Sequence, residues 1–158
     1  MASRIRVQPR GRRRTALAIA ALTLRPTALA TIVAALTVLP LAWWFGSAWA
    51  GLALVGQLAL GFWVSFAAHE VAHAVTLPPE AGPAVEGTWS SVYVCASPDL
   101  VGARSAAAGP VVGTLTCLLL GAAGLAALAW VPLAFLHLVN LTSLCPDGRI
   151  LRESVGGQ

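Results

Sequence analysis

Two histidines and a glutamate with metal-binding spacing lie near the middle of the chain. His69, Glu70 and His73 form a His-Glu-x-x-His motif, and residues four apart on a helix share a face, so both imidazoles can bind one metal ion. Zinc held by three protein ligands keeps a fourth position open for water, acidifies that water and polarises a carbonyl group. Glu70 would lie beside that position and act as general base. The motif therefore predicts a zinc site that hydrolyses peptide bonds.

The composition places this motif in a membrane. Of the 158 residues, 58% are hydrophobic and 10% are charged, whereas soluble domains have about 25% charged residues. All ten basic residues are arginine, and seven of them precede residue 26. This basic run adjoins an apolar segment and contains no aromatic residue, which favours a topogenic signal over a nucleic-acid interface. A cleaved signal peptide with its site at residues 28–30 is a less favoured alternative.

Two stretches without charge predict four transmembrane helices. Residues 26–68 contain no ionisable side chain, and residues 105–146 contain only His137 apart from cysteines. Each stretch is long enough for two spans of about 20 residues. We expect the turns within them at residues 43–47 and 130–132, which are rich in tryptophan and contain no arginine. The fold class expected is an all-α polytopic membrane protein with about four transmembrane helices.

The loop between the second and third spans has β character. Residues 88–94 combine polar, aromatic and β-branched side chains, which predicts a short strand or hairpin. Arg104 lies in this loop and Arg149 and Arg152 follow the last span, so the positive-inside rule places the loop and both termini in the cytoplasm of, we expect, a bacterial cell membrane. Three segments follow: a basic cytoplasmic tail (1–25), a membrane-embedded metalloprotease core (26–152) and a C-terminal tail (153–158).

A third metal ligand must come from another part of the chain. The candidates are the other carboxylates, one histidine and one cysteine: Glu80, Glu86, Asp99, His137, Cys145, Asp147 and Glu153. Asp147 is favoured because its helix and that of His69 are predicted to approach the same membrane face. On a continuous helix His137 would lie about 15 Å deeper than Asp147, which predicts a buried neutral imidazole. Cys145 is expected to behave as a small apolar residue.

Three ordered motifs resemble those of the site-2 protease family of intramembrane zinc metalloproteases. The family carries His-Glu-x-x-His on one transmembrane helix and an Asp-Gly motif on a later one, which residues 140–151 resemble. Residues 108–113 are similar to the family's Ala-Gly-Pro-x-x-Asn segment between them. The chain departs from the pattern at Gly113, where the family usually has Asn, and at Ser143, where Pro is common. A single glycine, Gly148, follows the aspartate.

The resemblance implies a set of roles for individual residues. His69, His73 and Asp147 would bind Zn²⁺, and Glu70 would be the catalytic base. Asn140 would position the substrate or the oxyanion of the transition state, although pairing with a neighbouring helix backbone explains this amide equally well. The substrate would be a membrane-spanning or membrane-associated protein or peptide, unwound so that its peptide bonds become accessible. The β-like run could bind it by strand addition.

Several alternatives stay open. A peptidase of the same type could mature a small exported peptide, and a proteolytically inactive homologue could bind a metal ion or a partner helix. A metal transporter is disfavoured because the ionisable groups are predicted at one depth, with only His137 as a second layer. The spacing does not distinguish zinc from other divalent ions, and zinc is expected from ligand type and availability.

Overall fold

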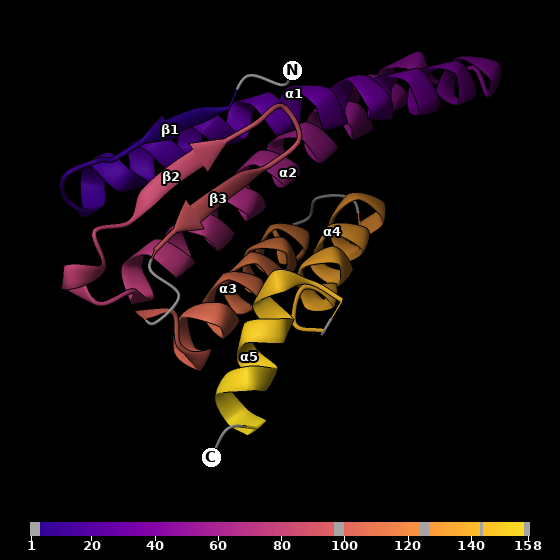
Figure 1. Ribbon diagram of the computed structural model, residues 1–158. Helices are drawn as coiled ribbons and strands as arrows, with labels where there is room; N and C mark the ends of the chain where they lie inside the picture. Colours follow the sequence, from indigo (N-terminus) through magenta and orange to yellow (C-terminus); the bar gives the residue numbers. More distant parts are fainter. Residues whose placement is uncertain (1–3, 97–99, 124–126, 143, 157–158) are drawn as a thin grey trace.

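The chain is mostly helical, with one small β-sheet. The computed structural model describes residues 4–96, 100–123, 127–142 and 144–156. Its elements are β1 (Ile5–Val7), α1 (Arg12–Trp44), α2 (Ala48–Thr76), the 3₁₀ helix η1 (Pro79–Ala81), β2 (Ala84–Gly87), β3 (Val92–Cys95), α3 (Ala103–Ala122), α4 (Ala127–Val139) and α5 (Pro146–Gly156). Figure 1 shows α1 paired with α2 and α3 paired with α4, with the sheet lying along α1 and α2.

Three helices, α1, α2 and α3, are long and apolar enough to cross a membrane. Only 6% of the most apolar window of α1 is buried, so its hydrocarbon side chains face outward, as they would toward lipid. These helices are compatible with a membrane protein and correspond to three of the four predicted spans. The region of the fourth contains α4, whose 13 residues fall short of the about 20 that a span needs.

The two predicted turns have different outcomes. The first is confirmed, because α1 ends at Trp44 and α2 begins at Ala48, and Trp43 and Trp44 are 77% and 84% exposed. The second, at residues 130–132, is wrong, because these residues lie inside α4. Trp130 is only 2% exposed, so this aromatic side chain fills the core between helices.

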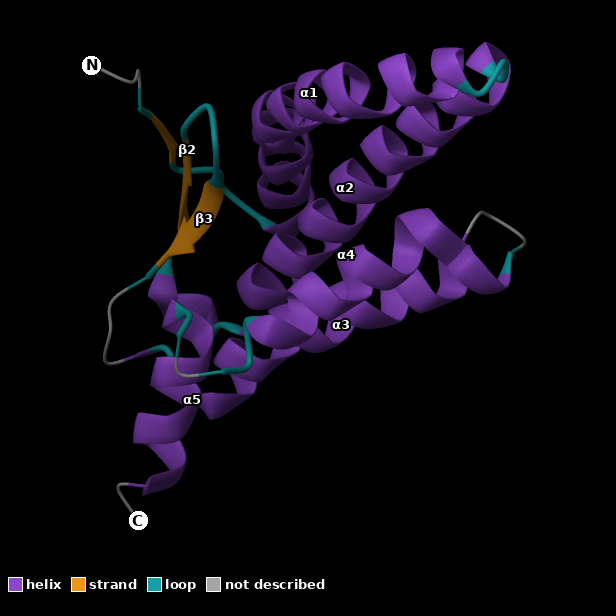
Figure 2. Ribbon diagram, turned by 90° about the vertical axis from the view of Figure 1, so that its right-hand side faces the viewer, coloured by secondary structure: helices purple, strands orange, loops and turns teal. Residues whose placement is uncertain are grey.

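The N-terminal residues belong to the folded structure. Strand β1 pairs antiparallel with β2, and Glu86 of β2 is buried and forms ion pairs with Arg4 and Arg6. Helix α1 begins at Arg12, so the expected boundary at residue 25 falls inside this helix. Pro26 lies in the interior of α1, where it lacks the N–H of a helical hydrogen bond, and Figure 2 shows α1 bent along its length.

The predicted β character of the loop is confirmed as a hairpin. Strands β2 and β3 pair antiparallel, and residues 88–91 connect them, with the Thr88 amide bonded to the Ser91 carbonyl at 2.8 Å. The strand order is β1-β2-β3, so β3 forms one edge of the sheet. Val85 and Val92 pack against Ile19 and other residues of α1 and α2, which fixes the sheet to this helical pair.

Helices α2, α3 and α4 share a second core around Trp130. This side chain packs with Cys117 of α3, Leu133 and Ala134 of α4, and partly buried residues of α2. Gly61 of α2 faces the indole so closely that a Cβ atom at this position would overlap with the ring. The contact holds α4 against α2, as expected for membrane helices that pack through small residues.

We predict that Gly61→Ala destabilises the bundle. The added methyl must displace the rigid indole of Trp130, and such overpacking usually costs about 1–3 kcal/mol. The measurement is the thermal unfolding midpoint of protein purified in detergent. The control is Gly56→Ala in the same helix, where a Cβ meets nothing within 4 Å and alanine favours the helix. Equal midpoints for the two variants would show that the contact between Gly61 and Trp130 does not stabilise the bundle.

Candidate metal centre

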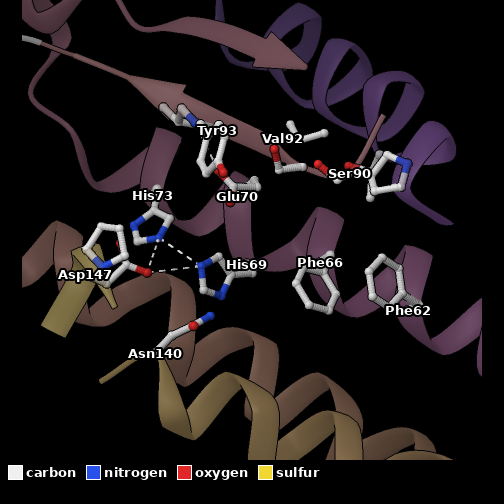
Figure 3. Close-up of a pocket in the computed structure, with 15 residues that line it drawn as sticks. Phe62, Phe66, His69, Glu70, His73, Ser90, Val92, Tyr93, Asn140 and Asp147 are labelled. Atoms are coloured by element: carbon white, nitrogen blue, oxygen red, sulfur yellow. Dashed lines mark hydrogen bonds and ion pairs between the residues drawn. The ribbon is translucent and has the colours of Figure 1, made fainter. Parts of the chain in front are cut away.

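The three predicted metal ligands lie together although α2 and α5 are far apart in sequence. His69 and His73 lie one turn apart on the same face of α2, and their Nε2 atoms are 3.1 Å apart. Asp147, in the first turn of α5, places Oδ2 at 3.4 Å from each of these nitrogens. Figure 3 shows both rings and the carboxylate converging on one point. Among the described residues, His69, His73 and Asp147 form a group of side chains that could hold a metal ion.

The distances within this cluster fit a tetrahedral metal ion. Bonds of about 2.0–2.1 Å at tetrahedral angles put ligand atoms about 3.3 Å apart, and the three edges measured here are 3.1, 3.4 and 3.4 Å. Nδ1 of His73 lies 2.7 Å from the carbonyl oxygen of Ser105. A carbonyl only accepts, so Nδ1 carries the proton and Nε2 directs its lone pair into the cluster. Lone pairs and a carboxylate at this distance require a cation or a proton between them.

The position of Asp147 favours its charged form. Its side chain is 22% exposed, and burial alone would raise its pKa. When the histidines carry the protons of the cluster, their hydrogen bonds and charges outweigh this effect, and the pKa of Asp147 lies below its usual value. A cation in the cluster would act in the same direction. The first turn of a helix also stabilises a carboxylate through the helix dipole. Asp147 is therefore available as an anionic ligand.

A tight turn between α4 and α5 brings Asp147 to the histidines. Helix α4 ends at Val139, and α5 starts at Pro146, whose missing N–H is not needed at a first helical position. A Cβ at Gly148 would overlap with the backbone carbonyl of Thr142. Only glycine therefore allows α5 to lie so close to the preceding turn, which explains the requirement for glycine directly after the aspartate.

Helix α3 supports His73 through the Ala-Gly-Pro segment. The imidazole lies against Gly109, and a Cβ at this position would overlap with the ring. The same helix provides the Ser105 carbonyl that binds Nδ1. The segment that resembles a family motif in the sequence thus makes room for one candidate ligand and orients it.

Glu70 and Asn140 line the same pocket as the cluster. The pocket has a volume of about 200 Å³ and is formed by α1, α2, the β2–β3 hairpin and residues around the start of α5. Glu70 is buried, and its Oε2 accepts a hydrogen bond of 3.0 Å from the backbone N–H of Val94 in β3. Figure 3 shows Glu70 on the side of the hairpin and Asn140 on the opposite side of His69. Phe62 and Phe66 extend the pocket along α2 as an apolar wall.

The predicted depth of His137 is wrong. The prediction assumed one continuous helix through Asp147, whereas the helix ends at Val139 and the chain turns before α5. His137 is fully buried, as expected, but its Nδ1 lies only 3.2 Å from Nδ1 of His69. In the sequence, His137 could have been recognised as a neighbour of the site because it is the single histidine in an otherwise apolar stretch.

The other candidate ligands that the structure describes are not part of the cluster. Glu86 forms ion pairs with two arginines in the sheet, and Asp99 lies outside the described residues.

No protein-family model, curated protein or solved structure matches the chain. Any function must therefore be argued from the geometry of the site.

We predict that Asp147→Asn weakens metal binding. The amide keeps the size of the side chain but loses the charge, and because loss of an outer-shell partner already lowers metal affinity about 10–100-fold, loss of a ligand should lower it more than about 100-fold. The affinity for Zn²⁺ would be measured by chelator competition in detergent. Glu153→Gln serves as control, because Glu153 is an exposed carboxylate on the same helix. Wild-type affinity in Asp147→Asn would exclude Asp147 as a ligand.

Proposed function

We propose that this chain is a zinc endopeptidase whose active site lies within a membrane. The proposal rests on the presence of two chemical groups in one pocket. These are a His-His-Asp cluster with metal-ligand spacing and the buried carboxylate of Glu70. The histidines and Glu70 belong to α2, a helix long and apolar enough to cross a membrane. A pocket that combines a metal site with an adjacent carboxylate is suited to hydrolysis.

The residues of the pocket would divide the reaction between them. His69, His73 and Asp147 would hold the ion, which when bound supplies a Lewis acid that acidifies water and polarises a carbonyl. Glu70 would take a proton from water as the water oxygen attacks the peptide carbon. It would return that proton to the amide nitrogen as the C–N bond breaks, which yields a carboxylate and an amine. The N–H of Val94 would hold the Glu70 carboxylate in place.

The edge of β3 supports the proposal that the substrate is a peptide bound in extended form. The N–H of Val94 points away from β2 and toward Glu70, so by the alternation of a strand Val92 presents its backbone groups on the same edge. Residues 90–94 line the pocket. A transmembrane segment hides its peptide bonds in helical hydrogen bonds. Strand addition to β3 would replace those bonds and bring a peptide carbonyl beside Glu70.

The arginines support an orientation of the protein in the bilayer. The positive-inside rule would place both termini and the hairpin on the cytoplasmic side. Although α4 is shorter than a full span, it would return the chain to this side, because Asp147 after α4 lies beside His73 near the end of α2. The pocket lies next to the hairpin. Water and an unwound substrate would then enter from the cytoplasm. The apolar wall of Phe62 and Phe66 suits a membrane-spanning or membrane-associated peptide.

We predict that Glu70→Gln abolishes cleavage and leaves zinc binding intact. The amide has the same shape but cannot accept the proton, and general-base catalysis contributes about 10²–10⁴-fold, so the rate should fall at least about 100-fold. The probe is a mixture of synthetic single-span peptides of varied sequence in liposomes, with products identified by mass spectrometry. Zinc content is measured on the same samples.

Glu80→Gln is the matched control, because Glu80 is an exposed carboxylate outside the pocket and its loss should leave cleavage unchanged. Cleavage by Glu70→Gln at the wild-type rate would contradict the assigned role of Glu70. A zinc-loaded wild type that cleaves no peptide would contradict the peptidase proposal and favour a metal-binding membrane protein without proteolytic activity.

A further inference from the structure

His137 is a fully buried imidazole that has no role in the proposed hydrolysis. It lies on α4, and its side chain makes one hydrogen-bond contact within the described residues, to Nδ1 of His69 at 3.2 Å. Its Nε2 atom is buried without a hydrogen-bond partner. Burying a polar group in an apolar bundle is unfavourable unless the group is paired. Within the described residues, the only polar partner of this ring is therefore a candidate metal ligand.

The contact between the two Nδ1 atoms couples the tautomers of the two rings. One Nδ1 must donate and the other must accept. If His69 donates, its Nε2 has a free lone pair directed at His73 and Asp147, which a metal ligand needs. If His137 donates instead, neutral His69 carries its proton on Nε2, inside the cluster, where it blocks metal binding. Metal binding through His69 thus requires His137 as the acceptor.

The surroundings of His137 hold its ring in one orientation. On one side the imidazole lies against Gly113 of α3, where an added Cβ would be 2.6 Å from Nδ1 and 2.7 Å from Cγ of the ring. On another side Phe66 of α2 lies 4.6 Å away between ring centroids. Gly113 is also the position at which the Ala-Gly-Pro segment departs from the family pattern. Any side chain at this position would displace the imidazole, so the glycine and the histidine form a matched pair.

We propose that His137 is a positioning residue of the metal centre, whose Nδ1 accepts the Nδ1–H of His69 and thereby directs Nε2 of His69 at the ion. This inference rests on the proposed metal centre and does not depend on proteolysis. The second ligand is held in the equivalent way, because Nδ1 of His73 donates to the carbonyl of Ser105. Each histidine of the motif therefore has one outer acceptor, and the two acceptors come from different helices.

The test compares two replacements of His137. In His137→Asn the side-chain oxygen lies near the position of Nδ1 and can accept the hydrogen bond, whereas His137→Phe fills the space without an acceptor. Binding of Co²⁺ to detergent-purified protein reports the affinity by chelator competition and the ligand geometry by the visible d–d absorption. The Phe variant should bind about 10–100-fold more weakly with an altered spectrum. The Asn variant should recover most of the affinity and the wild-type spectrum.

A second pair of variants tests the same role without changing His137. Gly113→Ala should displace the imidazole and weaken Co²⁺ binding. Gly121→Ala in the same helix should not, because its Cβ would meet Trp130 only at ordinary contact distances of 3.7 Å or more. Thermal unfolding of the metal-free proteins separates a loss of fold from a loss of metal binding. If His137→Phe does not fold, the Gly113→Ala result decides.

The outcomes distinguish this inference from the proposed function. Wild-type Co²⁺ affinity and spectrum in His137→Phe would overturn the inference and leave the peptidase proposal standing. Equal losses in the Asn and Phe variants, with equally lowered unfolding midpoints, would assign His137 a packing role and also overturn it. A wild-type protein that binds neither Co²⁺ nor Zn²⁺ would overturn both proposals.

Discussion

The structure depends on the burial of a polar cluster inside an apolar helical bundle. The Nε2 atoms of His69 and His73 and the carboxylate of Asp147 face one another at 3.1–3.4 Å. Such groups are stable in an apolar interior only when each atom is paired. Inside the cluster they share one cation or proton, and outside it the remaining nitrogens of the two rings contact Ser105 and His137. Three helices beside α2 are needed to supply these partners.

Close approach of the helices makes this pairing possible, and glycines allow it at several points. A Cβ would overlap with Trp130 at Gly61, and equivalent clashes would occur at Gly109, Gly113 and Gly148. Glycine is a poor helix former in water, but membrane helices use small residues where backbones must come close. The same feature that packs the bundle therefore also positions both histidines and the aspartate.

The sheet connects the cluster to a surface for an extended chain. The ion pairs of Glu86 with Arg4 and Arg6 link its middle strand, β2, to the N-terminal segment that contains β1. Its edge strand, β3, contacts Glu70 through the Val94 amide. A bundle alone would offer no free backbone groups to a peptide. The proposed peptide hydrolysis rests on the combination of the His-His-Asp cluster, a buried carboxylate and an edge strand in one pocket.

The sequence alone determined the features that depend on local pattern. The four-residue spacing of His69 and His73 places them on one helix face, the apolar stretches indicate membrane-length helices, and the polar β-branched run indicates the hairpin. Asp147 could be ranked first among the candidate ligands, while zinc and the peptidase activity stay predictions. The tertiary structure decided that residues 130–132 lie inside α4, where the indole of Trp130 packs against Gly61 of α2. It also decided that α4 packs against α2, which brings His137 to His69, and that the helix ends at Val139 before α5 begins. Both results arise from contacts between segments that are distant in the sequence, so the local pattern of apolar and polar residues does not predict them.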